Sequence, residues 1–200
     1  ELLEDVRAAE VEKGLEGAAF EETARHGKFM FVRVDGRGWL VLHYGMSGSL
    51  TFWRADDGAP EHTALRVDFE DGSHLAYVCV RRLGRIGWVD SPRAVVESRA
   101  LGPDVFSDDF DWEVFSGLLE GRRGYLKSAL MDQHLMAGIG NECSDEILFQ
   151  CGLHPKTRVA DLDEQRRREV YEMLRSTLQT YVEHFPDIDE LADEIGRAHV

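Results

Sequence analysis

The chain has 200 residues, 43% of them hydrophobic and 30% charged, a balance typical of a globular protein with a buried core. Its 38 acidic residues outnumber its 23 lysines and arginines, and the net charge of −15 argues by itself against a nucleic-acid partner, because phosphate binding needs a cationic surface. No apolar run reaches the 18 residues of a membrane span, and the acidic, amphipathic N-terminus is unlike a signal peptide, so we expect a cytoplasmic protein without a membrane partner.

The first half of the chain has the pattern of β structure. Short runs rich in β-branched and aromatic residues alternate with turn sequences such as Asp-Gly, which is typical of antiparallel strands. The expected strands are 28–35, 39–45, 48–54, 64–70 and 74–80. Regular short strands of this kind predict an antiparallel sandwich.

The pattern changes near residues 98–108, where Gly102-Pro103 interrupts the chain and Ser107 to Asp111 offer helix caps. From there on, apolar residues recur with a period near 3.6, which indicates helices. The expected helices are 112–119, 126–135, 144–151 and 163–183. We therefore predict an α+β fold, with a β-sandwich domain over residues 1–103 and a helical domain over residues 104–200.

Two glycines and an asparagine lie between the second and third of these helices. Gly138 and Gly140 can adopt positive φ and allow another backbone to approach closely, and Asn141 is a candidate N-cap for the helix that follows. The free N–H groups of such a helix attract phosphate. A compact helical hairpin without a ligand is the alternative, and the spacing leaves both interpretations open.

The residues of this corner, LMDQHLMAGIGNECSDEILFQCGLHP (130–155), closely resemble the helix-two-turns-helix signature of the Fpg/Nei family of DNA glycosylases. Four further motifs occur in the order that the family has. They are RHGKFMFV (25–32), LHYGMSGSL (42–50), YVCVRRLGRIGWV (77–89) and LGPD (101–104). Five motifs in family order are far more specific than any one of them. Although the protein is acidic overall, residues 81–85 and 121–127 are locally basic.

The resemblance implies a monomeric DNA N-glycosylase with abasic-site lyase activity on oxidised purines, acting in base excision repair on double-stranded DNA that holds a damaged base or abasic site. Such enzymes evert the damaged nucleotide from the stack. The residues that match those filling the vacated space are Met46, Arg81 and Leu83, with Leu83 in place of the usual Phe. The residues that match phosphate contacts are Lys28, His43, Asn141 and Lys127. Taken singly, each would be read as core filler or a solvated polar side chain, and their joint order carries the assignment.

The chain departs from the family pattern in several places. Family members begin with a proline whose amine attacks the sugar, whereas this chain begins Glu1-Leu2 and has no proline before Pro60, so we identify no catalytic residue. Residues 4–17 can be aligned either with the family's first helix or with a later strand. Glu142 adds negative charge beside the corner and should weaken DNA binding.

Three cysteines without a Cys-x-x-Cys pair predict neither a zinc site nor any other cofactor. Two alternative functions remain open. One is a catalytically inactive DNA-binding remnant that lacks the proline nucleophile. The other is a protein-interaction module built on the amphipathic, acidic helix expected at 163–183.

Overall fold

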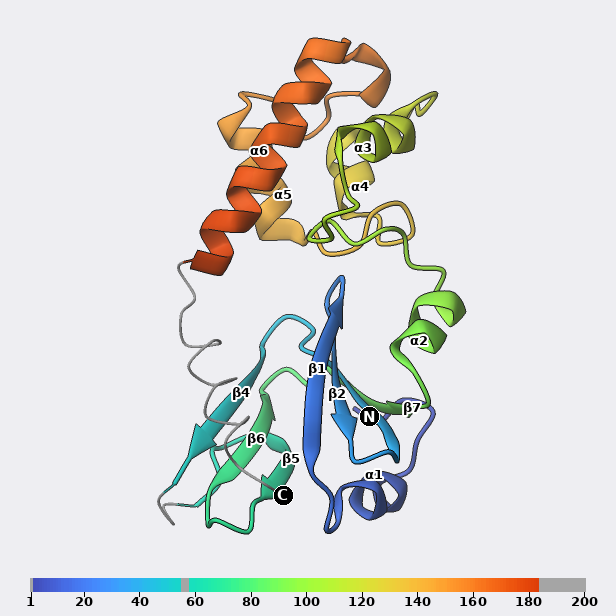
Figure 1. Ribbon diagram of the computed structural model, residues 1–200. Helices are drawn as coiled ribbons and strands as arrows, with labels where there is room; N and C mark the ends of the chain where they lie inside the picture. The colour runs from blue at the N-terminus through green and yellow to red at the C-terminus, as the bar shows by residue number, and fades with distance from the viewer. Residues whose placement is uncertain (1, 55–57, 184–200) are drawn as a thin grey trace. The chain divides into compact units, whose positions relative to one another are not determined.

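The computed structural model describes residues 2–54 and 58–183 (Figure 1). It divides into two compact units, one ending at Val95 and the other beginning at Val96. The division falls within helix α2 (Pro92–Ser98). Within the described residues, none of the helices combines the length and the apolar character that crossing a bilayer requires.

The first unit contains two antiparallel sheets and the short helix α1 (Ala8–Leu15). One sheet has the strand order β1-β2-β3-β7, and the other has the order β4-β6-β5. The strands are β1 (Phe20–His26), β2 (Phe29–Val34), β3 (Gly38–His43), β4 (Gly48–Trp53), β5 (Thr63–Asp68), β6 (His74–Cys79) and β7 (Arg85–Val89). Side chains of both sheets and of α1 share one core, among them Leu42, Tyr77 and Val11, which is the arrangement of a β-sandwich.

The five strands expected from the sequence are present, and each observed strand end lies within two residues of the expected one. Strands β1 and β7 were both missed. The sequence of β1, FEETARH, is largely polar and its burial pattern is mostly exposed, so it lacks the apolar alternation that indicates a strand. The open choice for residues 4–17 is resolved in favour of a helix, since Val11 and Leu15 lie on the buried face of α1.

The second unit is helical. Its helices are α3 (Trp112–Leu119), α4 (Leu126–Met131), α5 (Asn141–Gln150) and α6 (Glu164–Glu183), with a 3₁₀ turn at Val159–Asp161. Asp111 caps α3, since its Oδ1 accepts the backbone N–H of Val114 at 2.9 Å, as expected from the sequence. The long helix α6 packs on α5 and α3 and buries Val170, Leu174 and Leu178 in the common core. The apolar stripe of α6 is therefore buried inside the unit.

Candidate nucleic-acid interface

Five predicted contact residues lie at one end of the first unit's four-stranded sheet. Phe29 at the start of β2 is opposite His43 at the end of β3, and His43 is opposite Arg85 at the start of β7. The β1–β2 turn, the β3–β4 connection and the β6–β7 connection therefore leave the sheet at the same end (Figure 1). These three connections carry Lys28, Met46, Arg81 and Leu83, and His43 ends its strand beside them. We call this end of the unit the loop surface.

Lys28 and His43 are placed by the β1–β2 hairpin. Gly27 and Lys28 form its two-residue turn, and Gly27 has a φ of 56°, the conformation that a type II′ turn demands at its first central residue. The His43 ring lies against Phe29, with ring centroids 4.8 Å apart, and its Nδ1 accepts the backbone N–H of Gly45 at 3.1 Å. Because Nδ1 is an acceptor, the neutral ring carries its proton on Nε2. An amine and an imidazole N–H donor thus occur on neighbouring strand ends.

Met46, Arg81 and Leu83 lie on two connections that adjoin on the loop surface. Arg81 Nη1 donates to Met46 Sδ at 3.6 Å, and the backbone N–H of Arg81 donates to Ser47 Oγ at 3.3 Å. Met46 is 73% exposed and Leu83 is 50% exposed, which is unusual for large apolar side chains on neighbouring loops. The structure therefore places the Met46 side chain against the Arg81 guanidinium, with Leu83 exposed on the same connection as Arg81. Ser47 is a supporting residue that the sequence analysis missed.

Close backbone packing fixes these loops. Gly45 has a φ of 61°, and a Cβ there would lie 2.5 Å from the carbonyl oxygen of Leu83. A Cβ on Gly84 would lie 1.7 Å from the hydroxyl oxygen of Tyr77, which donates to the carbonyl of His43 at 2.9 Å. Burial raises the pKa of Tyr77 well above its usual range, so its hydroxyl stays protonated and continues to donate.

In the second unit, the remaining predicted contacts flank the corner between α4 and α5, residues 132–140. Helix α4 ends at Met131 rather than at residue 135, because the chain turns there around the Gln133 side chain. Gln133 Nε2 donates to the carbonyls of Met131 and Ile139, both at 2.9 Å, and its Oε1 accepts the N–H of Gly138 at 3.1 Å. One side chain thus joins both ends of the corner, a role that the sequence analysis did not assign.

The Leu-Gly-Pro motif (residues 101–103) is hydrogen-bonded to the backbone of the same corner. The N–H of Ala137 donates to the carbonyl of Pro103 at 2.9 Å, and the N–H of Gly102 donates to the carbonyl of Gln133 at 2.9 Å. A Cβ on Gly102 would lie 2.5 Å from the backbone of Leu135. The glycine is therefore needed for two backbones to approach each other, and the motif belongs physically to the helical unit.

The prediction that Asn141 caps α5 is wrong. Gly140 occupies the N-cap position, and its carbonyl accepts the N–H of Ser144 at 2.9 Å. Its φ is −107°, so only Gly138, with a φ of 126°, uses the positive-φ freedom expected of both glycines. Asn141 is instead the first helical residue, where its side chain lies beyond reach of the orphan N–H groups that an N-cap satisfies.

The Asn141 side chain is engaged by Asp145, one turn further along α5. Asn141 Nδ2 donates to Asp145 Oδ2 at 3.2 Å, and Lys127 Nζ on α4 donates to Asp145 Oδ1 at 2.6 Å. The structure therefore brings Lys127 and Asn141 to the same carboxylate. The sequence analysis missed this role for Asp145, although its spacing of four residues from Asn141 indicates a shared helix face.

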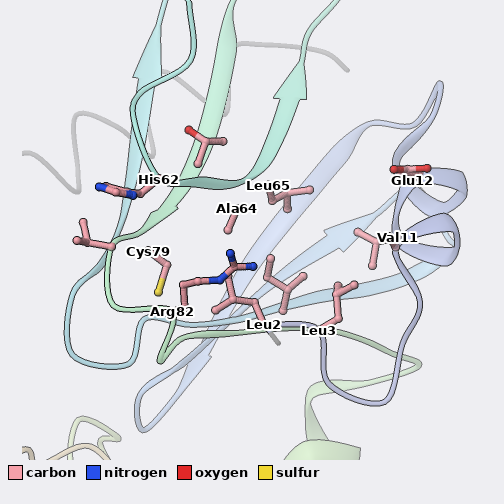
Figure 2. A pocket seen from close by; sticks show the side chains of 13 residues that line it. Leu2, Leu3, Val11, Glu12, His62, Ala64, Leu65, Cys79 and Arg82 are labelled. Carbon is pink, nitrogen blue, oxygen red and sulfur yellow. The ribbon is translucent and has the colours of Figure 1, made fainter.

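A separate cavity of about 350 Å³ lies in the first unit. It is lined largely by apolar residues, including Leu2, Leu3, Val11 and Leu65, and Figure 2 shows the Arg82 side chain among them. None of the predicted contact residues lines it, but Val80 and Arg82 of the β6–β7 connection do, so the cavity adjoins the loop surface. No group of histidines, cysteines and carboxylates suited to a metal ion occurs among the residues that the structure describes.

Comparison with known proteins identifies both units. Residues 1–86 match the domain model of the formamidopyrimidine-DNA glycosylase N-terminal domain, and residues 101–188 match that of the formamidopyrimidine-DNA glycosylase H2TH domain. A formamidopyrimidine-DNA glycosylase of Acaryochloris marina is 32% identical over 192 residues, which cover 90% of this chain and 68% of the relative. That of Gluconobacter oxydans is 35% identical over 179 residues, covering 86% and 63%.

The fold has a counterpart among solved structures. The Lactococcus lactis formamidopyrimidine-DNA glycosylase, non-covalently bound to DNA containing an AP site, matches with a TM-score of 0.80 at 25% identity. The match covers 88% of this chain and 68% of that one. The chain spans between 60% and 68% of the length of the curated relatives that it matches.

Proposed function

Because the chain belongs to the formamidopyrimidine-DNA glycosylase family, within the wider Fpg/Nei family, we propose that it binds duplex DNA at an everted, damaged nucleotide. We further propose that the protein acts in base excision repair, as an N-glycosylase with abasic-site lyase activity on oxidised purines. The solved relatives include complexes with abasic-site DNA and with DNA containing a formamidopyrimidine lesion, which supports this class of substrate.

One observation carries the proposal. Met46 and Arg81 come from two connections far apart in sequence, yet their side chains are in contact, and Leu83 is exposed two residues beyond Arg81 in the same connection. Eversion of a nucleotide leaves a gap in the base stack and costs a few kcal/mol. Exposed apolar side chains can fill such a gap, because stacking against the neighbouring bases requires no hydrogen bond.

The neighbouring residues suit the sugar–phosphate backbone. The guanidinium of Arg81 has five N–H donors for the base that has lost its partner. Lys28 and His43 beside it, and Lys127 and Asn141 in the second unit, present donors of the kind that hold phosphates without reading sequence. Together these groups account for binding and eversion, and none of the described residues is assigned as the nucleophile.

The binding proposal is tested with a fluorescent duplex that carries a tetrahydrofuran abasic analogue, against the same duplex undamaged. We expect tighter binding to the abasic duplex, and Met46→Ala should lower the affinity for it about tenfold, by loss of one apolar side chain's burial. Val182→Ala is the matched control, because Val182 is an exposed apolar residue that no motif assigns to DNA. Equal affinity for both duplexes, or equal effects of the two variants, would count against the proposal.

Catalysis needs a different readout. A lyase that forms a Schiff base is trapped on an oxidised-guanine duplex by borohydride as a covalent adduct. We expect the adduct from the full-length protein. Tight, abasic-selective binding without an adduct would instead identify a DNA-binding protein without lyase activity.

A further inference from the structure

Asp145 is an acidic residue in the middle of a proposed phosphate-binding surface. From its charge alone, Asp145 should weaken DNA binding, because a carboxylate repels phosphate, and its removal should then tighten binding. Its contacts indicate the opposite. Both oxygens of its carboxylate are occupied by the two residues of this unit that the family resemblance assigns to phosphate, at 2.6 Å from Lys127 and 3.2 Å from Asn141.

We propose that Asp145 is a positioning residue that holds Lys127 of α4 and Asn141 of α5 together so that both can reach one phosphate. The inference rests on the proposed function, because it concerns how the same DNA contact is prepared. The proposal assigns an acidic residue to the phosphate-binding surface, where the residues assigned so far are hydrogen-bond donors.

Lys127 and Asn141 keep enough N–H donors to bind a phosphate while they are bonded to Asp145. A lysine ammonium has three N–H groups and an asparagine amide has two, and each gives one to Asp145. Because both side chains bond to one carboxylate, the Lys127 ammonium and the Asn141 amide lie close together, and so do their remaining N–H groups. A phosphate, whose non-bridging oxygens are spaced much like those of a carboxylate, can therefore accept from both.

Burial supports a fixed arrangement at Lys127. Its side chain is 24% exposed, and that of Asp145 is 48% exposed, so the ammonium is held partly inside the unit rather than extended into solvent. A free lysine loses several rotatable bonds when it binds a phosphate, which weakens binding. The contact with Asp145 restricts those bonds before DNA arrives.

The neighbouring acid Glu142 provides a matched control. It is exposed and lies in the first turn of the same helix, and among its side-chain interactions no bond to Lys127 or Asn141 is observed in the described structure. Removing its charge changes the electrostatic field near the corner without releasing the two donors. Glu142→Gln should therefore tighten DNA binding, whereas Asp145→Asn and Asp145→Ala should weaken it.

The experiment measures the affinity of the full chain for the tetrahydrofuran duplex over a range of salt concentrations. We expect Asp145→Ala to weaken binding about tenfold at 0.1 M salt, the loss equivalent to one ordered contact. The slope of log affinity against log salt should decrease by about 0.9, the value for one phosphate contact. Asp145→Asn keeps the size of the side chain, so it tests the same expectation if the alanine variant is unstable in a thermal melt.

A second background separates positioning from general effects on structure. In a Lys127→Ala, Asn141→Ala protein, Asp145 has no donors left to hold and only its charge remains. Asp145→Ala should then tighten binding, which reverses the sign of its effect. A loss of affinity in both backgrounds would indicate a merely structural role and overturn the proposal.

Tighter binding by Asp145→Asn in the otherwise unaltered chain, comparable to that of Glu142→Gln, would also overturn it, because Asp145 would then act only by repulsion. If the unaltered chain shows no salt-dependent DNA binding at all, the proposed function fails, and the positioning role fails with it.

Discussion

Replacing Gln133 by methionine should destabilise the helical unit strongly, although Gln133 is only half-buried. Methionine matches the length of glutamine but makes none of its three hydrogen bonds, to Met131, Ile139 and Gly138. At about 1 kcal/mol for each bond, with a further penalty where a backbone group is left unpaired, the expected loss is about 2–4 kcal/mol. For a unit of this size, a loss of that magnitude lowers the melting temperature by roughly 10–20 °C.

The loss is measured as the change in urea midpoint followed by helical circular dichroism. Gln150→Met is the matched control, since Gln150 is exposed on α5 and bonds only to Glu146 one turn away, a contact that contributes about 0.2–0.5 kcal/mol. If Gln133→Met and Gln150→Met unfold within about 0.5 kcal/mol of each other, the assignment of Gln133 as the residue that holds the corner is wrong.

Three further predictions concern close packing and pH. Gly102→Ala should cost the helical unit more than about 1 kcal/mol, because its Cβ would meet the corner's backbone at 2.5 Å; chemical denaturation checks this. Gly84→Ala should disturb the loop surface, since its Cβ would overlap the Tyr77 hydroxyl; abasic-site affinity should fall while the far-UV spectrum is retained. The hydrogen bond from Arg66 holds the pKa of Asp68 below its usual range, so this carboxylate stabilises the fold above about pH 4 and the stabilisation is lost as pH falls further. Asp68→Asn should therefore reduce the difference in melting temperature between pH 6 and pH 3, and an unchanged difference would refute that role.

Much of the fold could be predicted from the sequence because its signals are local. Alternating apolar residues indicated most strands, and Asp111 with a helical period indicated α3 at its observed bounds. The polar strand β1 carried no such signal, since it is defined by its pairing with β2 rather than by its own residues. The signal for this strand is its place in a hairpin, next to the Gly27-Lys28 turn and the apolar strand β2, rather than an apolar pattern of its own.

The sequence predicted candidate site residues, but not the contacts that hold their side chains. Motif order identified Met46 and Arg81, and the structure brings the two side chains into contact. The contacts of Gln133 across the corner and of Asp145 with Lys127 on another helix are not encoded by spacing along the chain. Asn141 was given the wrong partner for the same reason, because an N-cap and a first helical residue differ by one position along the chain and the choice was made by the backbone of Gly140.

The charge of the chain illustrates how a bulk property and a local site can point in opposite directions. A net charge of −15 repels DNA, but salt largely screens this repulsion beyond about 10 Å at 0.1 M. Within that distance the outcome depends on which groups face the phosphate, and at the corner an acid is itself bonded to both donors. In our proposal, the same carboxylate that adds to the net negative charge strengthens the phosphate contact, because it positions Lys127 and Asn141. Counting acids and bases cannot distinguish these effects, because the count assigns Asp145 and Glu142 the same sign and the same weight. Of the two, Asp145 is the one bonded to Lys127 and Asn141, the residues that we propose to bind phosphate.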